Sequence, residues 1–83
     1  MEFEVNDRIL CIRQFMNNKS IVGQTGTIKT KKIIKGNFIY DVEFDEDIDG
    51  HDACGKYGYC WSFTISNPEE YFKLINSNLV ELI

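Results

Sequence analysis

The alternation of apolar and polar residues along the chain predicts β-strands. The clearest case is FIYDVEFD (38–45), in which aromatic and aliphatic residues alternate with acidic ones, as in a half-buried antiparallel strand. VNDRILCI (5–12) and YCWSFTI (59–65) show the same period of two. The expected inward residues are Val5, Ile9 and Cys11 in the first strand, Phe38, Tyr40, Val42 and Phe44 in the second, and Tyr59, Trp61, Phe63 and Ile65 in the third.

Turn residues divide these strands. Gly36-Asn37 is a candidate for a two-residue hairpin turn between KTKKII and FIYDV. In SNPEEYF, Asn67 can cap a helix, Pro68 suits its first position and Glu70 completes a capping box, which predicts a single helical turn. FKLI (72–75) and LVELI (79–83) are interpreted as closing strands, and residues 76–83 as an added C-terminal strand.

This order of elements predicts the fold class. A strand, a long loop, three hairpin-connected strands, one helical turn and a final strand indicate an all-β protein, a small SH3-like barrel of five to six antiparallel strands. An OB-like barrel is the main alternative. Eighty-three residues suit one domain, taken as 1–83.

Two sets of motifs carry a resemblance. VNDRILCI followed by GQTGTI resembles the KOW and SH3-like pattern, in which a strand and loop lead to a glycine turn. VEFDEDIDGH, GKYGYCW and NPEEYFKLI together are similar to small uncharacterised proteins of phages and prophages of low-GC Gram-positive bacteria. The likeness covers residues 5–75 and implies a fold rather than an activity. The chain departs from the pattern at Ser62, at 63–67 and at 76–83.

Charge and cysteine content refine the interpretation. The net charge of −4 hides a lysine cluster at 29–35 followed by an acidic cluster at 41–52. No signal peptide and no apolar run of membrane-spanning length is recognisable. An odd count of 3 cysteines favours free thiols in the cytoplasm of a bacterial host. Cys11 is assigned to the core, and the roles of Cys54 and Cys60 stay open.

The run DEDIDGHDACGKYGYCW (45–61) holds most of the candidate chemistry. Asp45, Asp47, Asp49 and Gly50 match the start of a calcium loop, but Lys56 stands where a bidentate glutamate is required. His51, Cys54 and Cys60 have zinc-ligand chemistry, with Cys11 or an aspartate as the fourth ligand. A cysteine nucleophile with His51 as base and Asp49 or Asp52 as orienting group is a third option. Neither metal, cofactor nor enzymatic activity is expected.

Lysines offer a nucleic-acid alternative. Lys29, Lys31, Lys32 and Lys35 could follow a phosphate backbone, with Tyr57 and Tyr59 as stacking platforms. A lysine-rich hairpin also serves as a solubilising edge that blocks strand addition. A further alternative is an oligomeric sponge for a nucleotide signal.

Protein recognition is the function that the sequence favours. Residues 45–58 form a 14-residue loop without predicted secondary structure, and such loops are commonly functional. We expect a non-enzymatic module, monomeric or a small homo-oligomer, that engages a host protein rather than a membrane. That protein could bind nucleic acid itself, as in a defence system such as CRISPR. The expected partner-binding residues are Asp45, Glu46, Asp47, Asp49, His51, Lys56, Tyr57 and Tyr59, with Gly50, Gly55 and Gly58 setting the loop geometry and His51 also bracing it.

Overall fold

The computed structural model of the chain describes residues 2–75, which form one antiparallel sheet of five strands. The expected strand at 76–83 lies outside these residues. Two short 3-10 turns accompany the sheet. The elements are β1 (Arg8–Cys11), η1 (Lys19–Ile21), β2 (Thr25–Ile34), β3 (Asn37–Phe44), β4 (Cys60–Ile65), η2 (Pro68–Glu70) and β5 (Phe72–Leu74).

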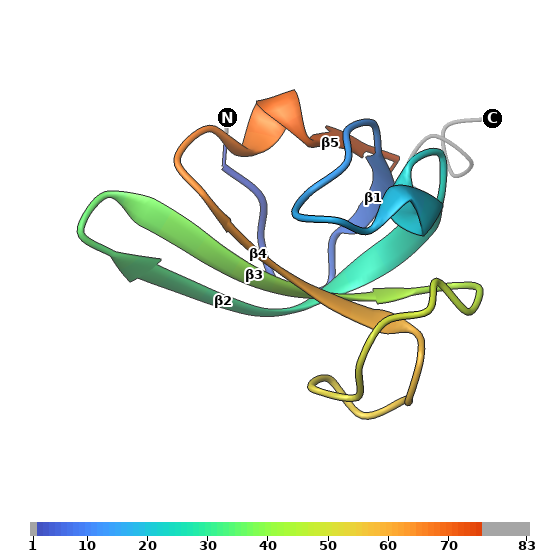
Figure 1. The fold of residues 1–83 in the computed structure, drawn as a ribbon. Helices are drawn as coiled ribbons and strands as arrows, with labels where there is room; N and C mark the ends of the chain where they lie inside the picture. Colours follow the sequence, from blue (N-terminus) through green and yellow to red (C-terminus); the bar gives the residue numbers. More distant parts are fainter. Residues whose placement is uncertain (1, 76–83) are drawn as a thin grey trace, which may run out of the picture.

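The strands follow the order β4-β3-β2-β1-β5, and every neighbouring pair is antiparallel. The predicted all-β class is therefore confirmed. Figure 1 shows the sheet curling so that β1, β5 and η2 lie above β3 and β4. Within residues 2–75 no pairing joins β4 to β5, so the sheet does not close into the expected barrel. At the start of β4, an isolated bridge from His51 to Cys60 lies on the edge of the strand that faces away from β3.

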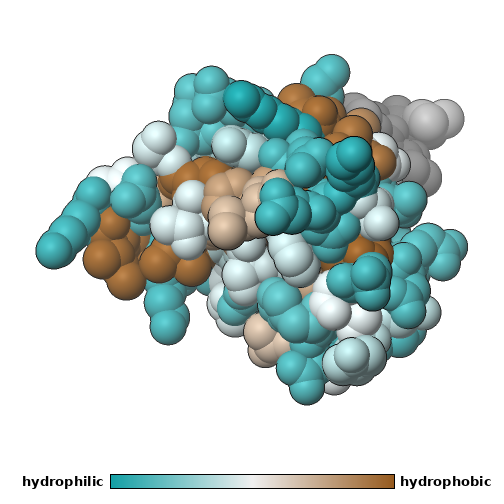
Figure 2. Space-filling model, viewed as in Figure 1, coloured by the Kyte–Doolittle hydropathy of each residue, from teal (hydrophilic) through white to brown (hydrophobic). Residues whose placement is uncertain are grey.

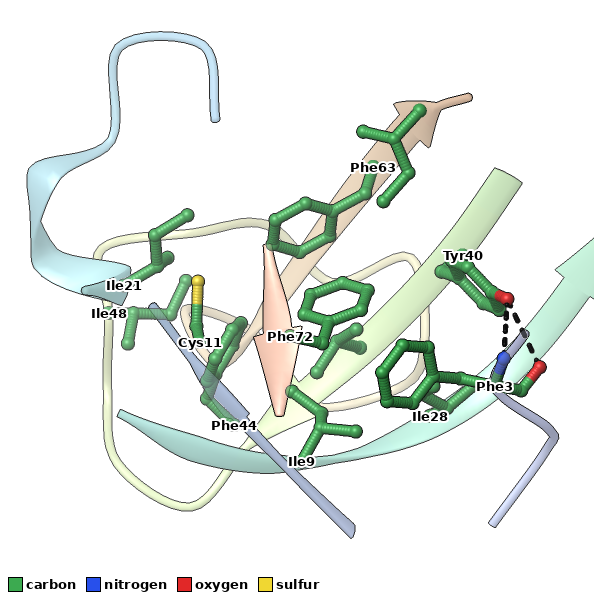
Figure 3. Close-up of a cluster of buried hydrophobic side chains, with 12 residues drawn as sticks. Phe3, Ile9, Cys11, Ile21, Ile28, Tyr40, Phe44, Ile48, Phe63 and Phe72 are labelled. Atoms are coloured by element: carbon green, nitrogen blue, oxygen red, sulfur yellow. Dashed lines mark hydrogen bonds between the residues drawn. The ribbon is translucent and has the colours of Figure 1, made fainter. Parts of the chain in front are cut away.

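The core fills the concave side of this curled sheet, as Figure 3 shows. The register places the predicted inward residues that lie within β3 and β4 on one face, which confirms the alternation for them; Tyr59 precedes β4 and is not part of this register. Phe3, from the segment before β1, covers this face, and its main chain exchanges two hydrogen bonds with the Tyr40 hydroxyl, of 3.0 and 3.1 Å. Val5 is the exception, because it precedes β1 and is exposed. The buried residues that form this hydrophobic core cluster are Phe3, Ile9, Cys11, Ile21, Ile28, Tyr40, Val42, Phe44, Ile48, Phe63, Ile65 and Phe72.

The hairpin between β2 and β3 turns one residue earlier than predicted. Ile34 pairs with Asn37, so Lys35 and Gly36 are the central residues of the turn. Their φ angles of 50° and 80° are both positive, as a type I′ turn requires. Asn37 was wrongly assigned to the turn, because it already belongs to β3. The long β2–β3 hairpin projects to the left in Figure 1.

The predicted helical turn is present as η2, with Pro68 at its start. Asn67 makes no side-chain capping bond, so this part of the capping-box prediction was wrong. A second 3-10 turn, η1, was not predicted; there the Asn18 side chain accepts a hydrogen bond from the Ser20 amide. Among the described residues, no helix has the length and apolar character needed to cross a membrane.

Candidate functional site

The segment between β3 and β4, residues 45–59 (the 45–59 loop), is fixed to the core by one isoleucine. Ile48 is 1% exposed although it stands between the acidic residues Asp47 and Asp49. The buried Asn18 side chain donates a hydrogen bond of 2.9 Å to the Ile48 carbonyl. Complete burial of an isoleucine side chain is worth roughly 1.5–3 kcal/mol. The loop therefore has a fixed point that the sequence analysis did not identify.

Main-chain hydrogen bonds shape the loop into a short irregular hairpin. The Ile48 and Gly50 amides both donate to the Gly58 carbonyl, at 2.9 and 3.0 Å. His51 and Cys60 donate to each other's carbonyls, at 2.9 Å from His51 and 3.3 Å from Cys60. A Cβ atom at Gly50 would overlap the Cys60 carbonyl oxygen, so this close approach requires glycine. The loop was expected to lack secondary structure, but main-chain hydrogen bonds join its first part, residues 48–51, to residues 58 and 60.

A disulfide between Cys54 and Cys60 closes the end of the loop, with the two Cα atoms 5.9 Å apart. The expectation of free thiols is thus wrong for these two residues, and the cysteine count no longer argues for a reducing compartment. Bonded to each other, the sulfurs are available neither as zinc thiolates nor as a nucleophile. Cys11 is the free cysteine; it lies in the core, where burial raises the pKa of its thiol.

His51 holds several parts of the loop together. Its Nδ1 atom accepts a hydrogen bond of 3.1 Å from the Ala53 amide, because a main-chain N–H can only donate. Its ring stacks on Trp61 at a centroid distance of 5.6 Å. Trp61 is fixed in turn by a bond of 3.1 Å from its Nε1 to the Phe15 carbonyl. His51 thus connects the loop to β4 through its ring face, while its Nδ1 atom holds the main chain of the loop itself.

A serine, a histidine and an aspartate meet on the outer face of the sheet, and the sequence analysis did not foresee this. The Ser62 hydroxyl donates to Asp41, whose other oxygen accepts from Thr30 at 2.8 Å. Ser62 also lies 3.4 Å from Nε2 of His51. In the neutral ring Nε2 carries the proton, since Nδ1 is an acceptor, so His51 cannot take the serine proton. The order of the three groups differs from that of a catalytic triad, in which the histidine lies in the middle.

Asp45, expected to bind a partner, is engaged within the protein. Its carboxylate accepts two bonds from the Arg8 guanidinium, at 2.7 and 2.6 Å, and one of 2.6 Å from the Thr25 hydroxyl. The hydrogen bond from Arg8 is the main reason that the pKa of Asp45 is lowered; burial opposes the shift. Asp45 therefore joins the start of the loop to β1 and β2.

The other acidic residues of the loop do not converge on a common point. Asp47 accepts a bond of 2.8 Å from the Asp49 amide, which stabilises a local turn. Asp45 faces Arg8 instead of these two, so the calcium template is not assembled. No group of three potential metal ligands occurs within residues 2–75. Exposed carboxylates remain along the loop at Glu46, Asp47, Asp49 and Asp52.

The two loop tyrosines differ in environment. Tyr57 is 79% exposed, whereas Tyr59 is partly buried beneath Lys56, whose Nζ lies 4.0 Å from its ring centroid. Positive φ angles of 119° and 88° at Gly55 and Gly58 allow the chain to turn on both sides of Tyr57. Of the predicted aromatic contacts, Tyr57 is the one that is free to reach a partner.

The lysine cluster lies on β2 and the following turn, apart from the loop, and half of it is neutralised. Lys31 binds Glu2 and, at 2.8 Å, Glu4; although burial opposes the charge, these carboxylates raise its pKa. Lys29 lies 3.5 Å from Glu43. The remaining members, Lys32 and Lys35, are exposed.

Three residues that hold this site together, Arg8, Asn18 and Ile48, were not identified from the sequence. Their contacts, Arg8 with Asp45 and Asn18 with Ile48, join residues that are 30 or more positions apart in the chain. Ile48 carried the one available signal, an isolated apolar residue within an acidic run. No family model matches the chain, and no curated protein or solved structure is significantly similar to it, so its own geometry must carry the functional interpretation.

Proposed function

We propose that this protein is a non-enzymatic binding module and that the 45–59 loop recognises a basic surface on a partner protein. The observation that carries the proposal is the combination of a 79% exposed tyrosine, Tyr57, with a loop held by Ile48 and a disulfide. A large exposed aromatic on a fixed support is the usual anchor of a protein interface. Holding it in place before binding reduces the entropy lost on association.

Charge supports a basic partner. Four exposed carboxylates lie on the loop, while Asp45 is already neutralised by Arg8. Such a surface attracts a positively charged protein and speeds encounter at low salt. The acidic residues therefore contribute steering and orientation, and Tyr57 contributes the buried contact.

The proposed scaffold is an SH3-like barrel that is open between β4 and β5. The strand order and the 3-10 turn before β5 are its support. By the resemblance noted above, the partner would be a host protein of a phage, and a nucleic-acid-binding protein of a defence system would present the basic surface required. Nucleic-acid binding through the lysine cluster is the less favoured function, because Lys29 and Lys31 are paired with carboxylates.

The test is a quantitative affinity capture from lysate of candidate host cells with four baits. These are the wild type, Tyr57→Ala, a charge variant (Glu46→Lys with Asp52→Lys) and Met16→Ala. Met16 is 69% exposed and lies outside the loop, so its variant is the matched control. We expect a protein captured by the wild type and the control and lost from the other two. The purified partner should then bind Tyr57→Ala at least about tenfold more weakly.

Circular dichroism and thermal melts of the baits are needed alongside, and exposed substitutions should leave both unchanged. Equal capture by all four baits would refute the proposal. Capture of nucleic acid that depends on Lys32 and Lys35 would replace it with the alternative function.

A further inference from the structure

The outer half of β2 has one uncovered edge. β1 pairs with β2 from Thr25 to Thr27, and two further main-chain bonds extend this contact as far as Ile28. Beyond the register shift that follows Ile28, β2 pairs with β3 alone within residues 2–75. The edge that faces away from β3 therefore leaves main-chain groups without a strand partner from residue 30 to residue 34.

The hairpin turn identifies the residues that present these groups. In a two-residue hairpin the pair beside the turn is hydrogen bonded, and that pair is Ile34 with Asn37. Hydrogen-bonded and non-hydrogen-bonded pairs alternate along an antiparallel ladder. Ile33 and Lys31 consequently direct their N–H and C=O groups away from β3, toward the open edge.

The side chains at the outer end of this edge are apolar and positively charged, whereas Lys31, at its inner end, is paired with Glu2 and Glu4. Ile33 is 58% exposed and Ile34 is 50% exposed, on opposite faces of the hairpin. Figure 2 shows apolar surface among hydrophilic side chains at the left, where the hairpin lies in Figure 1. Lys32 and Lys35 add two exposed charges with no ion pair among the described residues.

Charge decides which strand can add here. In a second copy of this chain, β2 would bring its own lysines against Lys32 and Lys35, and like charges on paired strands repel. A strand with acidic residues would instead be attracted, and its apolar residues would cover Ile33 and Ile34. Lys32 and Lys35 thus disfavour pairing with a second copy of β2 and favour pairing with an acidic strand.

We infer that the open edge of β2 is a second binding site, which takes an extended segment with alternating acidic and apolar residues from a partner protein by strand addition. Main-chain bonds to Lys31 and Ile33 provide affinity, and Lys32 and Lys35 provide selectivity for acidic residues. The site is separate from the 45–59 loop and does not depend on the function proposed for that loop.

The test uses a fluorescein-labelled peptide of seven alternating valine and glutamate residues, with its valine–lysine counterpart as the control ligand. Fluorescence anisotropy should show binding of the acidic peptide at low salt and much weaker binding of the basic one. Amide hydrogen exchange followed by NMR supplies the specific readout. Lys31 and Ile33 should become protected when the acidic peptide binds, whereas Lys32 and Ile34, already bonded to β3, should change little.

Two variants separate strand addition from charge attraction. Ile33→Pro removes the outward N–H without removing a bond to β3, and proline is accepted at such edge positions. It should weaken binding at least about tenfold, the usual scale for losing a key contact. Lys32→Glu with Lys35→Glu should do the same at low salt, whereas Lys73→Glu, an exposed lysine on β5, should not.

The inference would be overturned by no binding of the acidic peptide, by unchanged affinity in both hairpin variants, or by protection at residues 45–59 instead of 31 and 33. Preferred binding of single-stranded DNA at the hairpin would also overturn it. If Ile33→Pro does not fold, the lysine variants and the exchange pattern of the wild type still decide the question. The Tyr57→Ala variant should bind the acidic peptide as the wild type does. A failure of the strand-addition inference can therefore be distinguished from a failure of the function proposed for the 45–59 loop.

Discussion

The 45–59 loop and the β2–β3 hairpin show that regular secondary structure and tertiary fixation are separate properties. The hairpin is a regular ladder with a tight turn, yet its end carries two exposed isoleucines and an uncovered edge. The loop has almost no regular structure, yet a buried isoleucine, a disulfide and several main-chain bonds hold it. Each region presents apolar surface to solvent, but the loop presents it from a cross-linked support and the hairpin from a free strand edge.

The largest expected difference between the two regions concerns their isoleucines. Ile48→Ala removes a side chain that is 1% exposed and should lower the free energy of unfolding. Buried isoleucine-to-alanine changes typically cost about 2–5 kcal/mol. Ile33 is 58% exposed, so Ile33→Ala should change the free energy of unfolding by less than about 0.5 kcal/mol. Urea unfolding followed by tryptophan fluorescence measures both values.

The loss caused by Ile48→Ala should also be local. Hydrogen exchange should accelerate at the Gly50 and Gly58 amides more than in the β1–β2 pairing, because those amides lie in the loop that Ile48 anchors. A similar loss of stability in the two alanine variants would contradict the contrast between loop and hairpin.

The disulfide is the second difference, since it cross-links the loop and has no counterpart in the hairpin. Closing a loop of about seven residues is worth about 2 kcal/mol in the chain-entropy model. Reduction should therefore lower the free energy of unfolding by about that amount and leave the hairpin pairing intact. Unfolding curves with and without a phosphine reductant, together with NMR of the β2–β3 amides, test this.

Cys54→Ala is the matched control for reduction. It removes the cross-link but leaves Cys60 in its buried position. This variant should match the reduced wild type in stability, and the reductant should have no further effect on it. A reductant effect on Cys54→Ala would mean that the cross-link is not the source of the change.

Local pattern predicted most of the sheet. The alternation in β3 and β4 identified their inward residues, since a strand with one buried face must repeat every second position. The turn was misplaced by one residue because both Gly36 and Asn37 tolerate positive φ, and only the register with Ile34 distinguishes the two alternatives. The sequence could not decide whether the barrel closes, because closure depends on whether the two end strands of the sheet, β4 and β5, pair with each other.

The site was harder to predict because its order arises from distant contacts. Cys54 and Cys60 are six positions apart, which is compatible with free thiols, a metal site or a disulfide, and spacing alone does not choose among them. The acidic residues were treated as equivalent, yet Arg8 engages Asp45 and leaves the others exposed. Where a side chain is satisfied internally, composition overestimates its role in binding.

The smallest expected effect is the pH dependence that Asp45 contributes to stability. Its pKa in the folded protein lies below the ordinary value of 3.8, chiefly because of the hydrogen bond from Arg8. The stabilisation is therefore complete above pH 3.8 and is lost as the pH falls through the folded-state pKa. Since the side chains of Arg8 and Asp45 are 37% and 43% exposed, solvent screening limits the effect to at most about 1 kcal/mol.

Asp45→Asn isolates this contribution, because the amide keeps the shape of the side chain but does not titrate in this range. The difference in the free energy of unfolding between wild type and variant should be largest near pH 7 and should shrink toward zero in the acid range below pH 3.8, as the pH falls through the folded-state pKa. Other carboxylates titrate in both proteins and cancel in the difference. A difference that stays constant across this range would mean that the ion pair between Arg8 and Asp45 does not hold the start of the loop, and that Ile48 and the disulfide fix it without electrostatic help.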